Sequence, residues 1–243
     1  MNVSVLTRPD VDLLYQRPHG LCMPVNEIHI WQVSLTDSVL LTGELWNVLN
    51  LAERQKASRF RRKQNQTCSI LSRGMLRAIL AWYLDIDPVS LEFSYGLYGR
   101  PYLPPEYGLD FSVSHSNDLI LYSFARRCRV GIDVEHETNL PEWTHMISRM
   151  FSSREQDWVA SLSAPEQRKT FFKLWTLKEA YGKMQGDGLT DSWKDIDILS
   201  ILKEQNDLTS KTFIPAPEYT AALVAEGIPD RIVRFNGFRG MIS

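Results

Sequence analysis

The segment DFSVSHSNDLILYSFARRCRVGIDVEH (110–136) contains three apolar runs that are joined by short polar turns. Aliphatic and aromatic residues dominate each run, and each run has the length of a single strand. We therefore predict strands at 110–114, 119–125 and 129–135. Three consecutive strands indicate that β-sheet forms a main part of the fold.

The last of these strands carries two carboxylates. Because side chains alternate between the faces of a strand, Asp133 and Glu135 share one face, and Ile132 and Val134 share the other. Two neighbouring carboxylates repel each other, and a divalent cation such as Mg²⁺ relieves that repulsion. A strand whose polar face meets water has the same pattern, so the D-x-E spacing alone does not decide between a metal site and a solvated face.

Helices are expected on both sides of this segment. The spacing of apolar residues predicts helices at 40–50 and 68–84. Ser163 and Glu166 have the spacing of a capping box, and the helix that they open is expected to end just before Gly186.

Further strands are predicted from short apolar runs. These runs lie at 27–33, 91–95, 219–225 and 231–235. The glycine and prolines of YGRPYLPP (98–105) indicate a loop. Strands and helices in mixed order are typical of an α+β fold with antiparallel sheet.

Composition describes an ordinary globular protein. The chain has 243 residues, of which 44% are hydrophobic and 23% charged, and its formal net charge is -2. Its three scattered cysteines form no CxxC pair, which argues against a disulfide framework or a zinc site and fits a reducing compartment. The first twenty residues lack a basic region followed by an apolar core, and no apolar stretch is long enough to span a bilayer. We expect a cytoplasmic protein with no membrane partner.

The most uneven charge lies between residues 54 and 77, where eight residues are basic and none is acidic. The basic residues are Arg54, Lys56, Arg59, Arg61, Arg62, Lys63, Arg73 and Arg77. Such a segment attracts polyanions, and arginine in particular binds phosphate through two parallel hydrogen bonds. A solvated basic face and a nucleic-acid surface are the alternatives.

The motif SVSHS (112–116) places polar groups at the end of a predicted strand. Ser114 and His115, with the backbone N–H groups of the following turn, are suited to binding phosphate. A serine nucleophile with a histidine base is disfavoured, because adjacent residues of a strand point to opposite faces. An ordinary polar turn has the same composition.

The segment FFKLWTLKEAYGKMQGDGL (171–189) has the richest chemistry. On a helix, Trp175, Glu179 and Lys183 lie on one face, and Lys178 lies beside them. If this face meets the D-x-E strand, Glu179 supplies a third carboxylate and Lys183 is close enough to contact phosphate. A surface Glu–Lys pair, which contributes only about 0.3–0.5 kcal/mol, is the simpler interpretation.

Taken together, the motifs resemble those of the surfactin-type 4′-phosphopantetheinyl transferases. That family has G-x-D-x-E followed by W-x-x-K-E-A-x-x-K-x-x-G-x-G-L, and this chain has GIDVE and WTLKEAYGKMQGDGL. Four further segments resemble elements of the family and occur in the same order along the chain: ERQKASRF (53–60), SRGMLRAIL (72–80), YGRP (98–101) and FSVSHS (111–116). The resemblance covers roughly residues 27–225. Arg100, where lysine is commoner, and the acidic Glu53 are the departures.

The resemblance implies a fold of two similar α/β halves with pseudo-twofold symmetry and a coenzyme A cleft between them. The halves would be 27–127 and 128–243, after an extended lead-in at 1–26. The implied enzyme moves the 4′-phosphopantetheine arm of coenzyme A, its co-substrate, to a serine of an apo acyl or peptidyl carrier protein and releases adenosine 3′,5′-bisphosphate. A monomer without a nucleic-acid partner is expected.

The resemblance also implies roles for individual residues. Asp133, Glu135 and Glu179 would hold Mg²⁺, with Mn²⁺ as an alternative, and Lys183 would contact the pyrophosphate. Candidates for the coenzyme phosphates and adenine are Arg54, Lys56, Ser69, Arg73, Arg100, Ser114 and His115. The serine proton needs an acceptor, and both Glu179 and Glu155, the latter through a water, are open as the general base.

Two other classes of function remain in view. A non-catalytic polyanion-binding protein would explain the basic segment but neither the D-x-E pair nor the K-E-A-x-x-K helix. A degenerate transferase would bind coenzyme A without turnover, but the three presumed metal carboxylates are all present. The sequence does not indicate which carrier proteins or acyl-coenzyme A derivatives are used.

Overall fold

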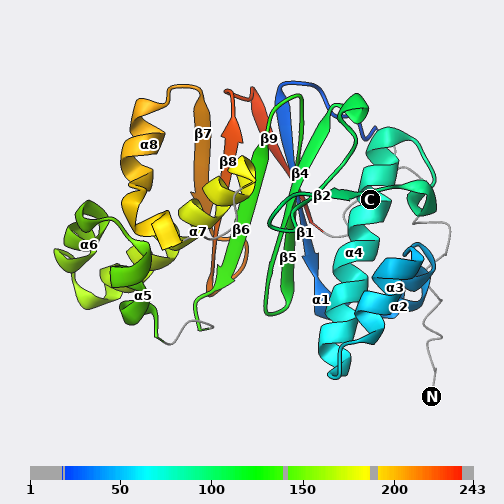
Figure 1. The fold of residues 1–243 in the computed structure, drawn as a ribbon, viewed down its shortest axis with the longest axis horizontal. Coiled ribbons are helices and arrows are strands. Elements are labelled where there is room, and N and C mark those ends of the chain that lie inside the picture. The colour runs from blue at the N-terminus through cyan, green and yellow to red at the C-terminus, as the bar shows by residue number, and fades with distance from the viewer. Residues whose placement is uncertain (1–17, 19, 139–141, 187–190, 237–243) are drawn as a thin grey trace, which may run out of the picture. The chain divides into compact units, whose positions relative to one another are not determined.

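The structure is a computed structural model that describes residue 18 and residues 20–138, 142–186 and 191–236. The elements, coloured along the chain in Figure 1, are β1 (Glu27–Ser34), α1 (Leu35–Ser38), η2 (Val39–Leu41), α2 (Thr42–Asn47), α3 (Leu51–Ser58), α4 (Lys63–Leu84), η3 (Pro88–Ser90), β2 (Ser94–Tyr95), β3 (Pro101–Tyr102), η4 (Pro105–Tyr107), β4 (Leu109–Ser116), β5 (Leu119–Arg126), β6 (Val130–His136), α5 (Trp143–Met150), α6 (Ser153–Ala160), α7 (Ala164–Gln185), η5 (Asp191–Asp195), α8 (Ile198–Glu204), β7 (Leu208–Phe213), β8 (Tyr219–Glu226) and β9 (Arg231–Asn236).

Most predicted elements are confirmed, with shifts of a few residues at their ends. The three strands of 110–136 are β4, β5 and β6, and the helix opened by Ser163 and Glu166 is α7, which ends at Gln185 and is capped by Gly186 with a φ of 85°. The strand predicted at 91–95 is wrong for all but Ser94 and Tyr95. The helix predicted at 40–50 is interrupted, because a 3₁₀ turn precedes the short α2.

The strands form two larger sheets and one hairpin. The order in the four-stranded sheet is β4-β5-β1-β9, that in the three-stranded sheet is β6-β8-β7, and β2 pairs with β3. β4–β5, β6–β8 and β7–β8 are antiparallel, whereas β1 and β9 are parallel, so the expectation of antiparallel sheet is wrong for that pair. The α+β class is confirmed.

The order of elements repeats along the chain. A strand (β1 or β6), short helices, a helix of 22 residues (α4 or α7) and a strand pair (β4–β5 or β7–β8) follow one another twice. In both sheets the strand pair lies beside the first strand, in the order β4-β5-β1 and β7-β8-β6. This repetition supports the predicted similarity of 27–127 and 128–243, whose limits stay a prediction.

Packing divides the described residues differently, into two compact units. The helical unit consists mainly of Val33–Glu92, and the sheet unit consists of Met23–Gln32 and the described residues from Phe93 onward. The limit between the predicted halves falls inside the sheet unit, because Ile28, Leu121 and Ile132 belong to one hydrophobic core.

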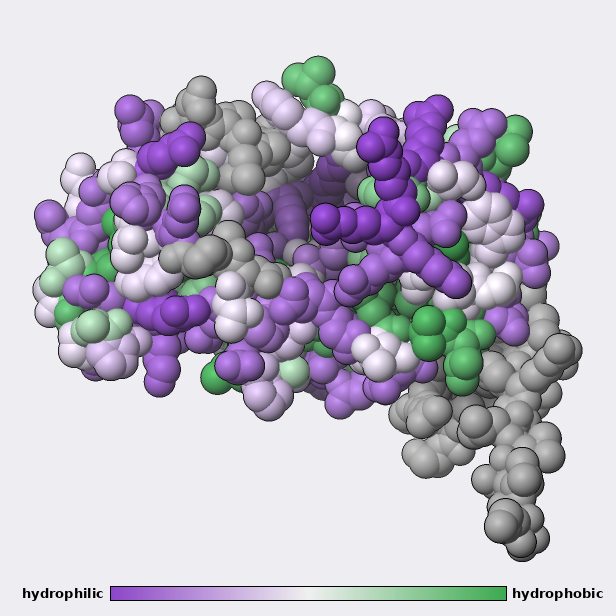
Figure 2. Space-filling view, turned by 90° about the horizontal axis from the view of Figure 1, so that it is seen from below, coloured by the Kyte–Doolittle hydropathy of each residue, from purple (hydrophilic) through white to green (hydrophobic). Residues whose placement is uncertain are grey.

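On the face shown in Figure 2, polar residues predominate and hydrophobic residues form small groups.

The helical unit is built around α4, whose buried side packs on α2 and α3. A Cβ on Gly74 would lie 2.7 Å from the Cβ of Leu45, so glycine lets α4 and α2 approach. Arg77 is fully buried and donates to Glu53 Oε2 at 2.7 Å and to the carbonyl of Pro88 at 2.8 Å. Arg77 therefore does not belong to an exposed basic face.

The sheet unit brings α7 against β6 and β8. Phe171, Leu174 and Met184 of α7 pack with Ala222 and Val224 of β8 in one core cluster. None of the helices among the described residues has the length and apolar content that crossing a membrane requires.

Candidate active site

Strand β6 presents its two carboxylates as the alternation of its sequence predicts. Ile132 and Val134 are buried in the sheet core, and Asp133 and Glu135 lie on the other face. Asp133 is itself only 3% exposed. A buried carboxylate needs polar partners, so a strand face that simply meets water is not the explanation for this pair.

Helix α7 brings a lysine to these carboxylates. Lys183 Nζ lies 2.7 Å from Asp133 Oδ1 and 2.8 Å from Ser114 Oγ, and Ser114 donates to the same Asp133 oxygen at 2.7 Å. Strand β4, strand β6 and helix α7 thus meet at one carboxylate oxygen. The sequence predicted that Lys183, Asp133 and Ser114 act together, although not through these hydrogen bonds.

The pKa of Glu179 shows that this side chain belongs to the same charged cluster. Burial, followed by repulsion from Asp133, raises the pKa of Glu179 to about 7, and Glu135 adds to the repulsion. The pKa of Glu135 is also raised, first by burial and then by Asp133, while the hydrogen bond from Ser116 opposes the rise. The three carboxylates therefore interact, and the site favours an added positive charge.

The described residues contain no ready-made cluster of three His, Cys, Asp or Glu side chains that would hold a metal ion. The donor chemistry nevertheless fits a hard cation, since carboxylate oxygens are the ligands that Mg²⁺ prefers. Asp133 Oδ2 is buried and forms no hydrogen bond, so it is available as a ligand. Lys183 already contacts Asp133 Oδ1, and its ammonium supplies part of the charge that the carboxylates require.

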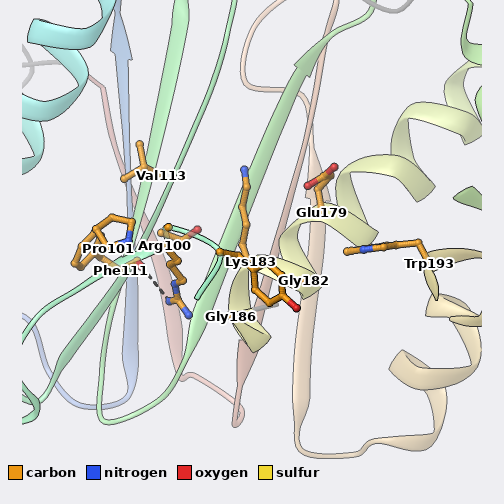
Figure 3. A pocket seen from close by; sticks show the side chains of 12 residues that line it. Arg100, Pro101, Phe111, Val113, Glu179, Gly182, Lys183, Gly186 and Trp193 are labelled. Atoms are coloured by element: carbon orange, nitrogen blue, oxygen red, sulfur yellow. Dashed lines mark hydrogen bonds between the residues drawn. The ribbon is translucent and has the colours of Figure 1, made fainter. Parts of the chain in front are cut away.

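A cavity of about 310 Å³ lies beside this cluster, inside the sheet unit. Tyr98, Arg100 and Phe111 contribute to its wall from the 27–127 half, and Glu179, Lys183 and Trp193 from the 128–243 half. Figure 3 shows Glu179 and Lys183 projecting from α7 on the same side. The cavity therefore adjoins the charged side chains that the sequence singled out.

Arg100 lies in the wall of this cavity but is held by the protein itself. Its Nη2 donates to both carboxylate oxygens of Asp110, at 2.9 and 2.8 Å, and its Nη1 donates to the carbonyl of Met184 at 3.3 Å. Burial raises the pKa of Asp110 despite the charge of Arg100. Arg100 thus links the end of α7 to the start of β4, a role that its sequence motif did not reveal.

His115 lies on the opposite face of β4 from Ser114, as strand alternation predicts, and is exposed. Its pKa is lowered by partial desolvation and then by the positive charge of Lys183.

Glu155 lies in a different environment from the one its expected role requires. It is fully buried, and its Oε2 lies 2.7 Å from Lys178 Nζ and accepts the backbone N–H of Ser152 at 2.8 Å. Its Oε1 accepts the backbone N–H of Ile198 at 2.9 Å. Lys178 also donates to the carbonyl of Trp193 at 3.0 Å. The Glu155–Lys178 pair thus fixes the segments packed around α7.

The remaining predicted coenzyme residues, Arg54, Lys56, Ser69 and Arg73, belong to the helical unit. Lys56 is exposed, and Ser69 is half-buried on α4. Arg54 donates to the carbonyls of Trp46 and Asn47 at 3.1 and 2.8 Å, and Arg73 lies 3.4 Å from Glu53 Oε1. Internal partners thus hold two of these four side chains, and their contacts with coenzyme A stay predictions.

Sequence reasoning missed two features of the site. A Cβ on Gly131 would lie 1.9 Å from the carbonyl oxygen of Ala180 and 2.6 Å from the amide nitrogen of Met184, so only glycine lets α7 pack this closely on β6. Ser116, on the same face of β4 as Ser114, donates to Glu135 Oε2 at 2.9 Å. The period of two in SVSHS was the available signal for Ser116.

Comparison with known proteins gives a consistent result. A family model described as "4'-phosphopantetheinyl transferase, N-terminal" matches residues 37–125, and one described as "4'-phosphopantetheinyl transferase superfamily" matches residues 129–227. These ranges together contain all six sequence motifs on which the resemblance rests.

Individual relatives agree with these matches. The chain is 32% identical over 176 residues to the 4′-phosphopantetheinyl transferase HetI of Nostoc sp., covering 71% of this chain and 74% of HetI. It is 31% identical over 157 residues to a putative 4′-phosphopantetheinyl transferase of Synechocystis sp., covering 64% and 63% of the two chains. It is 28% identical over 138 residues to Sfp of Bacillus subtilis, covering 57% and 60%.

Proposed function

The chain belongs to the 4′-phosphopantetheinyl transferase superfamily, and on that premise we propose the reaction and the roles of its residues. The enzyme transfers the 4′-phosphopantetheine arm of coenzyme A to a serine hydroxyl of an apo acyl or peptidyl carrier protein. Adenosine 3′,5′-bisphosphate leaves. The observation that carries the proposal is the contact of Lys183 with Asp133, next to Glu179 and the cavity.

Asp133, Glu135 and Glu179 are the residues that would hold Mg²⁺. The unbonded Asp133 Oδ2 and the mutual repulsion of the carboxylates support this assignment. When bound, the ion would neutralise negative charge on the pyrophosphate as the bond to the leaving group breaks. Lys183 has the complementary role, because its flexible ammonium can donate to phosphate oxygens while staying close to Asp133.

Glu179, rather than Glu155, is the proposed acceptor of the serine proton. Glu179 lines the cavity beside Lys183, so its carboxylate is accessible to a serine hydroxyl that enters the site. Glu155 is a poor candidate, because its buried carboxylate already binds Lys178 and two backbone N–H groups. Proton transfer to Glu155 would require breaking this network.

The coenzyme would lie against the cavity beside Glu179 and Lys183. Ser114 and His115, from β4, and Arg100 are proposed to contact its phosphates and adenine. Lys56, with Arg54, Ser69 and Arg73, is proposed to bind the more distant 3′-phosphate. Of these, Lys56 is the exposed side chain and so the most available to a ligand.

A direct test is to incubate the protein with coenzyme A, Mg²⁺ and a panel of apo carrier domains, and to weigh the products. We expect one phosphopantetheine per carrier domain, loss of the product on chelation of the metal, and no product with a folded Asp133→Ala variant. Near-normal Mg²⁺-dependent turnover by Asp133→Ala would overturn the metal assignment. Absence of product with every carrier, together with tight DNA binding at physiological salt, would overturn the transferase assignment.

A further inference from the structure

Strands β4 and β6 lie side by side although they belong to different sheets. Side chains of β4 take the place of a backbone ladder between them. The backbone N–H of Val130 donates to Asp110 Oδ2 at 2.8 Å, and that of Ile132 donates to Ser112 Oγ at 3.1 Å. The backbone N–H of His136 donates to Ser116 Oγ at 2.9 Å.

These contacts follow a strict pattern. Each joins an even-numbered residue of β4 to the residue twenty positions later, so the two strands run in the same direction in constant register. Residues two apart share one face of a strand, and for this reason one side of β4 serves the whole junction. The polar residues of DFSVSHS therefore align β6 along its length.

Ser116 differs from Ser112 in one respect. A hydroxyl has a single proton to donate and can accept as well. Ser116 accepts from the backbone N–H of His136 and donates to Glu135 Oε2, both at 2.9 Å. Ser112 accepts from the backbone N–H of Ile132 but contacts neither carboxylate of the D-x-E pair among the described hydrogen bonds.

We propose that Ser116 is a positioning residue that fixes the Glu135 carboxylate for metal binding, by a hydroxyl bridge from the β6 backbone to Glu135 Oε2. The inference rests on the proposed function, in which Glu135 is a metal ligand. Ser116 is 5% exposed, so water does not readily replace its hydroxyl. Its hydrogen bond holds one oxygen of Glu135, Oε2, in a fixed direction.

The position of Ser116 matches that of Ser114 two residues earlier. Ser114 donates to Asp133 Oδ1, just as Ser116 donates to Glu135 Oε2. Each carboxylate of the D-x-E pair thus has its own hydroxyl donor on β4. Hydrogen-bonded partners of metal ligands commonly change metal affinity by about 10–100-fold when they are removed.

Mn²⁺ binding provides a readout that does not require turnover. Metal-free protein with coenzyme A, but without a carrier protein, is titrated with Mn²⁺, and the free ion is followed by electron paramagnetic resonance. A titration of coenzyme A alone is subtracted. We expect Ser116→Ala to weaken Mn²⁺ binding about tenfold. Ser116→Thr, which keeps the hydroxyl, should restore most of the affinity.

Ser112→Ala is the matched control. Both alanine variants leave one β6 backbone N–H without its partner, so both should lower the melting temperature by a similar amount. Only Ser116→Ala removes a carboxylate contact, and only that variant should lose Mn²⁺ affinity. A Ser116→Ala protein with lowered melting temperature and the Mn²⁺ affinity of Ser112→Ala would overturn the proposal. If Ser116→Ala does not fold, the similarly shaped pair Ser116→Thr and Ser116→Val replaces it, and equal affinities would overturn the proposal.

Asp133→Ala in the same series separates this proposal from the proposed function. If Asp133→Ala binds Mn²⁺ as tightly as the wild type, or the wild type binds none, the metal site itself is wrong. If Asp133→Ala loses affinity and Ser116→Ala does not, the metal site stands and only the role of Ser116 fails.

Discussion

Replacing Glu179 by glutamine should change how the stability of the metal-free protein depends on pH. The pKa of Glu179 is raised from 4.5 to about 7 in the folded protein. Between these values the unfolded chain has an ionised Glu179 while the folded protein keeps it protonated. The folded state then binds more protons, so the free energy of unfolding decreases as pH rises from 4.5 to 7. Above pH 7 Glu179 is ionised in both states, and the free energy of unfolding stays lowered by the full cost of ionising this carboxylate in the folded protein.

The expected size follows from the pKa difference. One pKa unit corresponds to about 1.4 kcal/mol, so the difference between 4.5 and about 7 corresponds to roughly 3 kcal/mol. Partial exposure of Glu179 lets solvent screen the charge and reduces the expected value to about 2 kcal/mol. Glu179→Gln removes this penalty, so the variant should match the wild type near pH 4.5 and be more stable by about 2 kcal/mol at pH 8.

Urea denaturation of both proteins in EDTA, at intervals from pH 4.5 to 8.5, measures this difference directly. Glu166→Gln on the same helix is the control with the opposite sign. Hydrogen bonds from Ser163 lower the pKa of Glu166, so its contribution to stability is present above pH 4.5 and is lost as pH falls through the lower folded value. A Glu179→Gln difference that stays constant between pH 4.5 and 7 would refute the reasoning.

Three further variants test other contacts. Gly131→Ala should destabilise the fold strongly and abolish transfer, because its Cβ would lie 1.9 Å from the carbonyl oxygen of Ala180; wild-type melting behaviour would contradict this. Lys178→Met should cost about 3–5 kcal/mol in urea denaturation by leaving buried Glu155 without its cation, and adding Glu155→Gln should recover part of the loss. Lys56→Ala should raise KM for coenzyme A more than it lowers kcat, since a distant phosphate is bound alike in ground and transition states. With dephospho-coenzyme A this effect should disappear, and equal effects on both substrates would exclude contact of this residue with the 3′-phosphate.

Strong periodicity made part of the fold predictable. β5 and β8 are mostly apolar runs in which nearly every residue is buried, and β6 alternates apolar residues with the carboxylates of Asp133 and Glu135, so the three strands were located to within a residue or two. β7, with the sequence LTSKTF, has no such signal, because it lies at a sheet edge and is largely exposed. The strand predicted at 91–95 has alternating apolar residues, but Leu91 and Phe93 lie outside the two-residue pairing of β2 with β3.

The site was predictable as a set of residues but not as a set of contacts. The motifs predicted Asp133, Glu179 and Lys183 as site residues, and in the structure Lys183 forms an ion pair with Asp133. The charge partners of Lys178 and Arg77 could not be read from the sequence, because they lie 23 and 24 positions away on other helices. Arg77 was therefore counted with the basic segment and Lys178 was placed beside the Glu179 face, whereas buried ion pairs hold both side chains.

The approach of α7 to β6 explains why these parts of the sequence must occur together. Because Gly131 has no side chain, the backbone of α7 from Ala180 to Met184 can lie directly against the strand. That stretch contains Lys183 and directly follows Glu179, and Asp133 lies two residues after Gly131. Close packing of the backbones therefore sets the distance between the strand carboxylates and the helix side chains. The glycine of G-x-D-x-E thus has a geometric role, and the hydroxyls of β4 then fix the direction of the carboxylates that it brings to the helix.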